Sequence, residues 1–140
     1  MADYRKDVAR LKKPENITEA MYASGPYTLM RAFERDKTVN RLIKGGDEVV
    51  PLIERELKRG GMRLDEITRS CYAYILGHVD LDAAARILKP LFVRAMKRPD
   101  PFFIHFAARA LRLKNRLPVK PMDPLHSRAE LLETLDIIQR

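Results

Sequence analysis

Four polar side chains recur along one predicted helix at intervals that place them on a single face. His105, Arg109, Arg112 and Arg116 follow one another at spacings of four, three and four residues in an otherwise mainly apolar segment. Because these spacings match the helical period, the four side chains form one narrow polar stripe. Arginine offers forked donors to carboxylates and phosphates. The stripe therefore predicts either a site for an anion or acidic peptide, or simply the water-facing side of the helix.

A larger basic segment surrounds this stripe. Residues 83–121 hold ten Lys and Arg residues against the single acid Asp100, whereas the whole chain has a net charge of +8. Five of the ten cover one half of the preceding predicted helix: Arg86, Lys89, Arg94, Lys97 and Arg98. They fit an ordinary solvated face, but such residues also contact nucleic-acid phosphates. The chain has no Trp, and no aromatic platform interleaves with the charges to stack on bases.

The residue types that catalysis or metal binding needs are scattered along the chain. His78, His105 and His126 are far apart, and the lone Cys71 lies on the apolar side of its predicted helix. Neither arrangement matches a metal site or an activated nucleophile. The Gly-Gly pairs lack the flanking strand and the Lys-Ser/Thr of a phosphate loop. We therefore expect no catalytic residue, no metal site and no cofactor.

Length and composition favour one domain in a reducing compartment. The 140 residues are 46% hydrophobic and 33% charged, enough to form a core without disulfides. A single cysteine cannot form an internal disulfide. No apolar run approaches the roughly 20 residues of a membrane-spanning helix, and the N-terminus lacks the apolar core of a secretion signal. We expect a cytoplasmic protein that does not insert into membranes.

The spacing of apolar residues predicts an all-α fold. Apolar positions recur at three and four residues, and signals for strands and hairpins are nearly absent. A charged, frayed N-terminal segment is expected over 1–15, and an N-cap box at Asn16 and Glu19 begins a helical domain over 16–117. One helix is predicted from Pro26 to Gly45.

Aspartates are predicted to begin the four helices that follow. The capping candidates are Asp47, Asp65, Asp80 or Asp82, and Asp100. A Pro-rich connector over 118–126 then leads to a capping box at Ser127 and Glu130. The short amphipathic helix over 127–140 must dock on the rest of the chain.

The middle of the chain contains an internal repeat of two helix pairs. Residues 50–53 match residues 89–92 at an offset of 39, and the second helices match at an offset of 35, with Asp65 opposite Asp100. Proline in the first helix and aspartate at the turn resemble the HEAT-repeat family of α-solenoids over about residues 47–114. The pattern departs from the family at Ile104, which stands at its arginine position.

The resemblance implies a short HEAT-like α-solenoid of antiparallel helix pairs with terminal capping helices. In such stacks the second helix of each pair lines a concave surface. The polar stripe would then face a groove, beside its counterparts Ser70 and Tyr74 in the first pair.

These features predict a non-enzymatic adaptor that binds a protein or acidic peptide through the groove and the basic surface. The alternative is a nucleic-acid-binding helical module that uses residues 83–121. A base-excising glycosylase shares this architecture, but its aspartate beside aromatic residues is not identified in this sequence. A homodimer that covers the ends of the stack is also possible.

Overall fold

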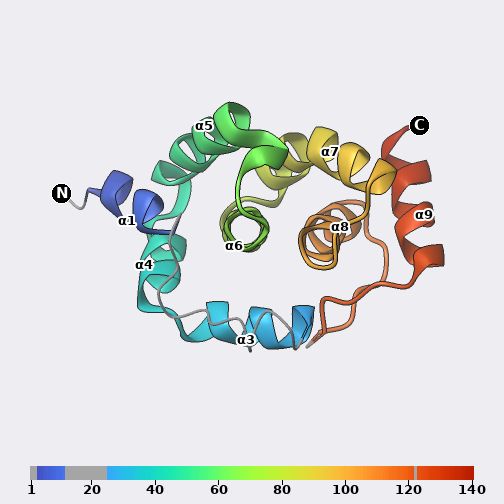
Figure 1. Cartoon of the computed structure of the whole chain (residues 1–140), viewed down its shortest axis with the longest axis horizontal. Coiled ribbons are helices and arrows are strands. Elements are labelled where there is room, and N and C mark those ends of the chain that lie inside the picture. The colour runs from blue at the N-terminus through green and yellow to red at the C-terminus, as the bar shows by residue number, and fades with distance from the viewer. Residues whose placement is uncertain (1–2, 12–24, 122) are drawn as a thin grey trace.

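A computed structural model describes residues 3–11, 25–121 and 123–140. Within these ranges the chain forms eight α-helices and no strand, which confirms the all-α prediction (Figure 1). The helices are α1 (Tyr4–Arg10), α3 (Pro26–Arg35), α4 (Lys37–Gly45), α5 (Val50–Gly60), α6 (Glu66–Val79), α7 (Leu81–Lys97), α8 (Phe103–Lys114) and α9 (Arg128–Ile138). Short 3-10 helices, η1 (Gly46–Glu48) and η2 (Gly61–Arg63), precede and follow α5.

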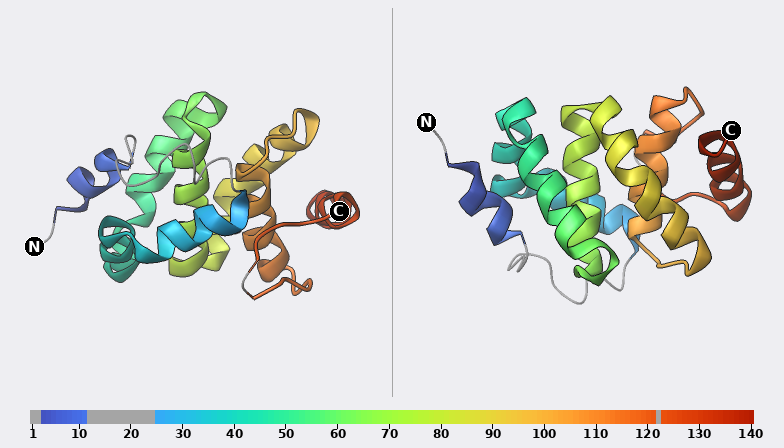
Figure 2. Two further views of the ribbon diagram at one scale, coloured as in Figure 1. Left: turned by 60° about the horizontal axis from the view of Figure 1, so that its bottom comes forward. Right: turned by 90° about the horizontal axis from the view of Figure 1, so that it is seen from above.

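The helices lie in layers in the view of Figure 1. α5 and α7 lie along one edge, α6 and α8 run beneath them almost along the line of sight, and α3 crosses on the other side of α6 and α8. α1 and α4 lie at one end of the molecule and α9 at the other (Figures 1 and 2). α8 packs against both α6 and α7, and α9 contacts α7 and α8. The central position of α6 and α8 makes these two helices the main scaffold for any site.

Side-chain caps begin most of the helices where the sequence predicts them. Carboxylates accept hydrogen bonds from backbone N–H groups in the first turns of α6, α7 and α8, and a full capping box begins α9. These bonds satisfy donors that a helix leaves without intrahelical partners. The N-caps are Asp65, Asp80 and Ser127, with Glu130 completing the box, whereas Asp100 lies before the N-cap position of α8, Phe102, and accepts from the N–H of Ile104. The predicted cap at Asp47 is wrong, because Asp47 lies in η1 and the N-cap of α5 is Val49, which makes no side-chain cap hydrogen bond.

The helix predicted from Pro26 to Gly45 is instead two helices. Asp36 has an extended backbone, and its carboxylate accepts a 3.0 Å hydrogen bond from the N–H of Val39. Asp36 therefore begins a new helix, α4, and the chain changes direction between α3 and α4 (Figure 1). No apolar residue lies between Phe33 and Val39, and six residues at about 100° each would place Val39 on a different face from Phe33 in one continuous helix. The apolar period therefore breaks at Asp36, and the one-helix prediction overlooks this signal.

The segment over 1–15 that the sequence predicts to be frayed is helical in its described part, where α1 forms. The Tyr72 hydroxyl group of α6 donates a 3.1 Å hydrogen bond to the carbonyl of Val8, and Val8 is buried. Tertiary contacts therefore stabilise α1, although its seven residues are too few to form a stable isolated helix. The capping box predicted at Asn16 and Glu19 lies outside the described residues.

The predicted core positions are buried. The apolar spacing predicts that Leu91, Phe106 and Leu111 are buried between consecutive helices. They are 6%, 2% and 1% exposed, which confirms their burial. Cys71 is also buried. Burial, together with a smaller effect of Asp36, raises the pKa of the Cys71 thiol well above its usual value, so the thiol stays protonated.

One buried arginine connects the two predicted helix pairs. Arg69 on α6 donates hydrogen bonds to the carbonyls of Met62 and Leu64 at 2.7 and 2.8 Å. Its other terminal nitrogen lies 3.4 Å from the carboxylate of Asp100, and its guanidinium lies over the Phe103 ring. Since Asp100 also caps α8, a single carboxylate fixes the start of α8 against α6.

The end of α8 directs the chain back onto the domain. Arg116 has a φ of 58°, and the Leu117 N–H donates a 2.8 Å hydrogen bond to the carbonyl of Arg112. With the bond from Arg116 N–H to the Leu113 carbonyl, this is a Schellman motif. Residues 118–121 and 123–127 are then non-helical, as the prolines predict. We call residues 118–121 and 123–140 the C-terminal arm.

Among the described helices, none combines the length and the apolar character that a membrane span requires.

Candidate functional site

The structure divides the predicted polar stripe of α8. His105 and Arg112 are buried, Arg109 is half-buried, and Arg116 is exposed beyond the end of the helix. The expectation that all four face one groove is therefore wrong. The physical reason is that the C-terminal arm packs back onto α8 and covers part of the stripe.

Arg112 is the residue that anchors the C-terminal arm. Its Nε donates to the carbonyl of Pro118 at 3.0 Å, and its Nη1 donates to the carbonyl of Glu130 at 3.0 Å. The same Nη1 lies 2.8 Å from the carboxylate of Glu133 and 3.2 Å from the Thr134 hydroxyl. The Arg112 side chain is only 2% exposed. Arg112 therefore already has an internal carboxylate partner and is not available to a ligand.

His105 holds the same arm through a second buried contact. Its Nδ1 accepts a 3.0 Å hydrogen bond from the backbone N–H of His126, and the two imidazole rings are stacked with centroids 6.0 Å apart. Burial lowers the pKa of both groups, that of His126 to about 4. Both imidazoles are therefore neutral near neutral pH.

The two predicted counterparts on α6 have different environments. Ser70 is fully buried, and its hydroxyl group donates a 2.8 Å hydrogen bond to the carbonyl of Glu66. Ser70 cannot line an open groove, so that expectation is wrong. Tyr74 is partly exposed and contacts Phe33 of α3 and Phe106 of α8, with ring centroids 5.5 and 6.5 Å away.

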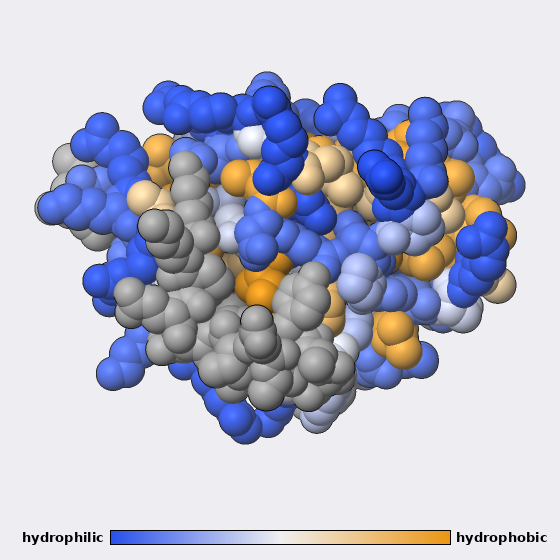
Figure 3. Space-filling view, viewed as in Figure 1, coloured by the Kyte–Doolittle hydropathy of each residue, from blue (hydrophilic) through white to orange (hydrophobic). Residues whose placement is uncertain are grey.

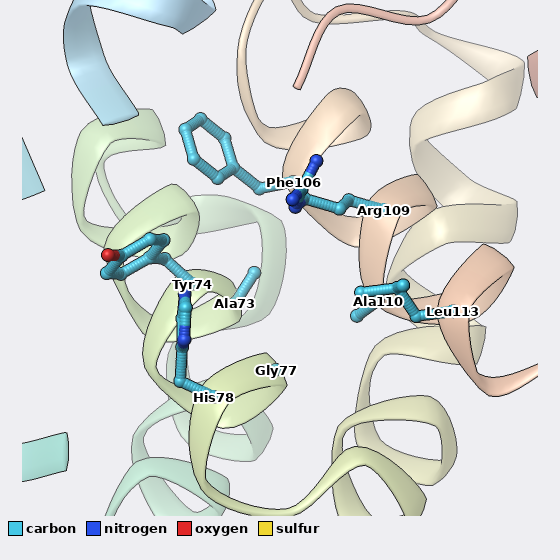
Figure 4. A pocket seen from close by; sticks show the side chains of 8 residues that line it. All are labelled: Ala73, Tyr74, Gly77, His78, Phe106, Arg109, Ala110 and Leu113. Carbon is cyan, nitrogen blue, oxygen red and sulfur yellow. The ribbon is translucent and has the colours of Figure 1, made fainter. Parts of the chain in front are cut away.

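Tyr74 and Arg109 share a small pocket between α6 and α8, which we call the Arg109 pocket (Figure 4). The cavity has a volume of about 140 Å³. The guanidinium of Arg109 donates to the carbonyls of Lys120 and Pro121 in the C-terminal arm, at 2.6 and 3.2 Å. The lining residues are Ala73, Tyr74, Gly77, His78, Phe106, Arg109, Ala110 and Leu113.

The Arg109 pocket carries one positive charge at neutral pH. Burial raises the pKa of Tyr74 and lowers that of His78, so both rings are neutral. Burial also lowers the pKa of Arg109, which shows that its charge is only partly solvated. No carboxylate in the described ranges forms an ion pair with Arg109. Two acids, Asp123 and Glu34, act on Arg109 from further away and favour its charged form. Asp123 accepts a 2.9 Å hydrogen bond from the N–H of Leu125, and Glu34 is paired with Arg31 at 3.0 Å.

A second and larger cavity, of about 410 Å³, lies between α5 and α7. We call it the outer groove, because α5 and α7 form one edge of the molecule, where hydrophilic side chains predominate (Figures 1 and 3). Of the predicted basic residues, Arg86 and Arg94 line this groove, whereas Lys97 is exposed outside it. The lining residues are Glu54, Leu57, Lys58, Gly61, Arg86, Ile87, Pro90, Leu91 and Arg94.

Acids from other parts of the chain neutralise part of the basic segment. Three of the ten basic residues in 83–121 form ion pairs with acids that lie outside the segment in sequence: Arg86 with Glu54, Lys114 with Asp82 and Arg112 with Glu133. The positive electrostatic potential around this segment is therefore weaker than its ten basic residues suggest. On α7 and its C-cap, the exposed cations without an ion pair to any described residue are Lys89, Arg94, Lys97 and Arg98.

Several lining residues were not predicted as site residues. The apolar spacing places Phe106 in the core, and His78 belongs to no cluster of ligand or nucleophile residues in the sequence. His78 lies four residues after Tyr74, and this spacing could have placed both on one face of α6. Glu54 and Lys58 have the same four-residue spacing on α5. In the described ranges, no group of three or more His, Cys, Asp or Glu side chains could hold a metal ion.

No protein-family model, no curated protein and no solved structure matches the chain.

Proposed function

We propose that the protein is a non-enzymatic adaptor of HEAT-like helix pairs that binds a carboxylate-bearing segment of a partner protein at the Arg109 pocket. The pairs would be α5 with α6 and α7 with α8, whose members pack on each other. The contact between Arg69 and Asp100 supports this stacking, because it joins the second helix of one pair to the start of the second helix of the next. α1, α4 and α9 would cover the ends of so short a stack.

The observation that carries the proposal is the half-buried guanidinium of Arg109, which forms no ion pair with a carboxylate in residues 3–11, 25–121 or 123–140. The carbonyls of Lys120 and Pro121 fix its orientation but carry no net charge. A cation withdrawn from water without a counter-ion is costly, and a bound carboxylate would offset that cost. Two of the five N–H donors of the guanidinium are used in these bonds, so further donors can meet a ligand.

The dimensions of the pocket favour a single acidic side chain as the ligand. A cavity of about 140 Å³ is smaller than the roughly 300 Å³ at which small-molecule pockets begin. Tyr74, Phe106 and Leu113 can contact the aliphatic part of a glutamate side chain while its carboxylate meets Arg109. A partner protein that presents a glutamate from its surface fits this geometry, and the lone buried Cys71 fits a reducing, cytoplasmic setting.

Nucleic-acid binding is the rival function, through the unpaired cations of α7. It is less favoured because internal acids neutralise three cations of the basic segment. The described residues that line the outer groove also include no aromatic side chain on which a base could stack.

An NMR titration with two small probes tests the proposal. N-acetyl-glutamate amide should shift the side-chain signals of Arg109, Tyr74 and His78, whereas the neutral N-acetyl-glutamine amide should not. Arg109→Gln should abolish the shifts, because glutamine retains a donor but no charge. Arg98→Gln is the matched control: it removes an exposed charge outside the pocket and should leave the shifts unchanged.

Two outcomes would overturn the proposed site. The first is equal shifts with both probes, and the second is shifts that persist in Arg109→Gln. An oligonucleotide of about twenty nucleotides that binds at about 150 mM salt, and that Arg98→Gln weakens but Arg109→Gln does not, would favour the rival function.

A further inference from the structure

The outer groove has the composition of a second recognition site. On α7, Arg86, Pro90 and Arg94 recur at intervals of four and line one wall, while Glu54 and Lys58 on α5 line the other. Residues four apart lie on the same face of a helix, so each helix directs its charged side chains toward the groove. Cations therefore stand on both walls.

The carboxylate of Glu54 partly neutralises the cations of the groove. Glu54 accepts two hydrogen bonds from Arg86, at 2.8 and 3.4 Å, and pairs with Lys58 at 3.1 Å. The Glu54 side chain is 17% exposed, whereas those of Arg86 and Lys58 are 61% and 75% exposed. The carboxylate thus lies at the base of the groove, and the cations extend to its rim.

Arg94 is the groove cation that this network leaves without a carboxylate. Three cations and one carboxylate give the groove a formal charge of +2. Gly61 lies beneath Arg94: a Cβ atom there would be 3.7 Å from its Nη1. Gly61 also has a φ of 54°, which favours glycine, so the turn after α5 leaves the space below the guanidinium unfilled.

We propose that the outer groove binds an acidic peptide segment of a partner protein, with one carboxylate on Arg94 and further carboxylates on Arg86 and Lys58. Charge complementarity supports this occupant. Leu57, Ile87 and Leu91 form an apolar base against which a small apolar side chain of the peptide can rest. This inference does not depend on the Arg109 pocket, which α6 and α8 form.

Fluorescence anisotropy with a labelled peptide of about twelve residues tests the proposal. The probe alternates glutamate and leucine, its control replaces every glutamate with glutamine, and both are measured at about 150 mM salt to screen weak surface attraction. Only the acidic probe should bind. Arg94→Gln should weaken binding roughly tenfold, the usual effect of one charge-assisted hydrogen bond. Arg98→Gln, the same change of charge outside the groove, should weaken it less than about twofold.

A gain of affinity provides the sharper readout. Glu54→Gln should strengthen binding of the acidic probe by about threefold or more, because Arg86 and Lys58 lose their internal carboxylate and can meet the peptide. Structural damage would not increase affinity. Equal losses in Arg94→Gln and Arg98→Gln would show general charge attraction and overturn the proposal, as would no gain in Glu54→Gln. If Arg109→Gln alone weakened binding of the acidic probe, the peptide would bind at the Arg109 pocket. This result would support the proposed function and overturn the present inference.

Discussion

Arg112 and Arg109 lie three residues apart on α8 and both contact the C-terminal arm, yet their environments differ. Arg112 is buried and meets the carboxylate of Glu133 at 2.8 Å. Arg109 lies in a pocket, and its hydrogen-bond partners among the described residues are the carbonyls of Lys120 and Pro121. The same residue type on one helix is therefore structural where the arm supplies a carboxylate, and is a candidate binding group where the arm supplies only carbonyls.

The largest expected effect is that of removing the structural arginine. Arg112→Ala should lower the free energy of unfolding by about 3 kcal/mol, because it removes a buried guanidinium together with its ion pair to Glu133 and three further hydrogen bonds. Urea denaturation followed by circular dichroism measures this change. Glu133→Gln is the control and should cost about 1 kcal/mol or less, since the Glu133 side chain is 53% exposed. A cost for Arg112→Ala no greater than that for Arg109→Ala would contradict the comparison.

Acidification should weaken the same contact region through the histidine pair. Burial lowers the pKa of His126 from 6.5 to about 4, and the neighbouring His105 and Arg112 also oppose its protonation, whereas Glu130 favours it. The unfolded chain therefore binds a proton that the folded chain does not between these two values. The stability that His126 contributes is complete above about pH 6.5 and is lost as the pH falls toward 4.

The expected size of this loss is about 2 kcal/mol between about pH 7 and about pH 5. Urea denaturation at several pH values in this window measures it. Other groups also titrate, so the informative quantity is the difference between the parent protein and His126→Gln. Parallel stability profiles for the two proteins would show that His126 does not titrate in this way.

A smaller effect is expected for the candidate binding arginine. Arg109→Ala should lower the free energy of unfolding by about 1 kcal/mol, because its hydrogen-bond acceptors, Lys120 and Pro121, are exposed and water can replace the lost donors. The same denaturation experiment measures it. A loss as large as that expected for Arg112→Ala would mean that Arg109 also acts mainly as a structural anchor.

The helices of this fold were largely predictable because the signals are local. Asp65, Asp80 and Asp100 cap helices within a few residues of themselves, and the apolar period identifies the buried faces. Asp36 is the instructive exception. It also caps a helix locally, and the six-residue step from Phe33 to Val39 interrupts the apolar period at the same place. Both local signals mark the break, and the prediction of one helix from Pro26 to Gly45 uses neither.

The site was less predictable because its partners come from distant parts of the chain. Arg112 meets Glu133 only after the Pro-rich connector reverses the chain, and helical spacing cannot indicate that reversal. Counting charges in blocks of sequence likewise separated Arg86 from Glu54, its partner in space. The internal repeat set Ser70 and Tyr74 beside the stripe of α8. Of these, Tyr74 does share a pocket with Arg109, because that juxtaposition depends on the packing of α6 against α8.

The smallest expected effect concerns Arg116, the last arginine of the stripe, whose backbone distinguishes it from both Arg109 and Arg112. Its φ of 58° places a residue with a Cβ atom in the left-handed region, at the position of the Schellman motif where glycine is usual. Arg116→Gly should therefore raise the free energy of unfolding by about 0.5 kcal/mol, because relief of strain exceeds the added entropy of the unfolded chain.

Asn115→Gly is the matched control. Asn115 has a φ of −96°, and its side chain donates a 2.8 Å hydrogen bond to the Leu111 carbonyl, so this change should destabilise the protein. Urea denaturation of both variants measures these changes. If Arg116→Gly destabilised the protein, the exposed guanidinium would contribute more to stability than the left-handed backbone costs. Arg116 would then belong with Arg109 as a residue retained for its charge.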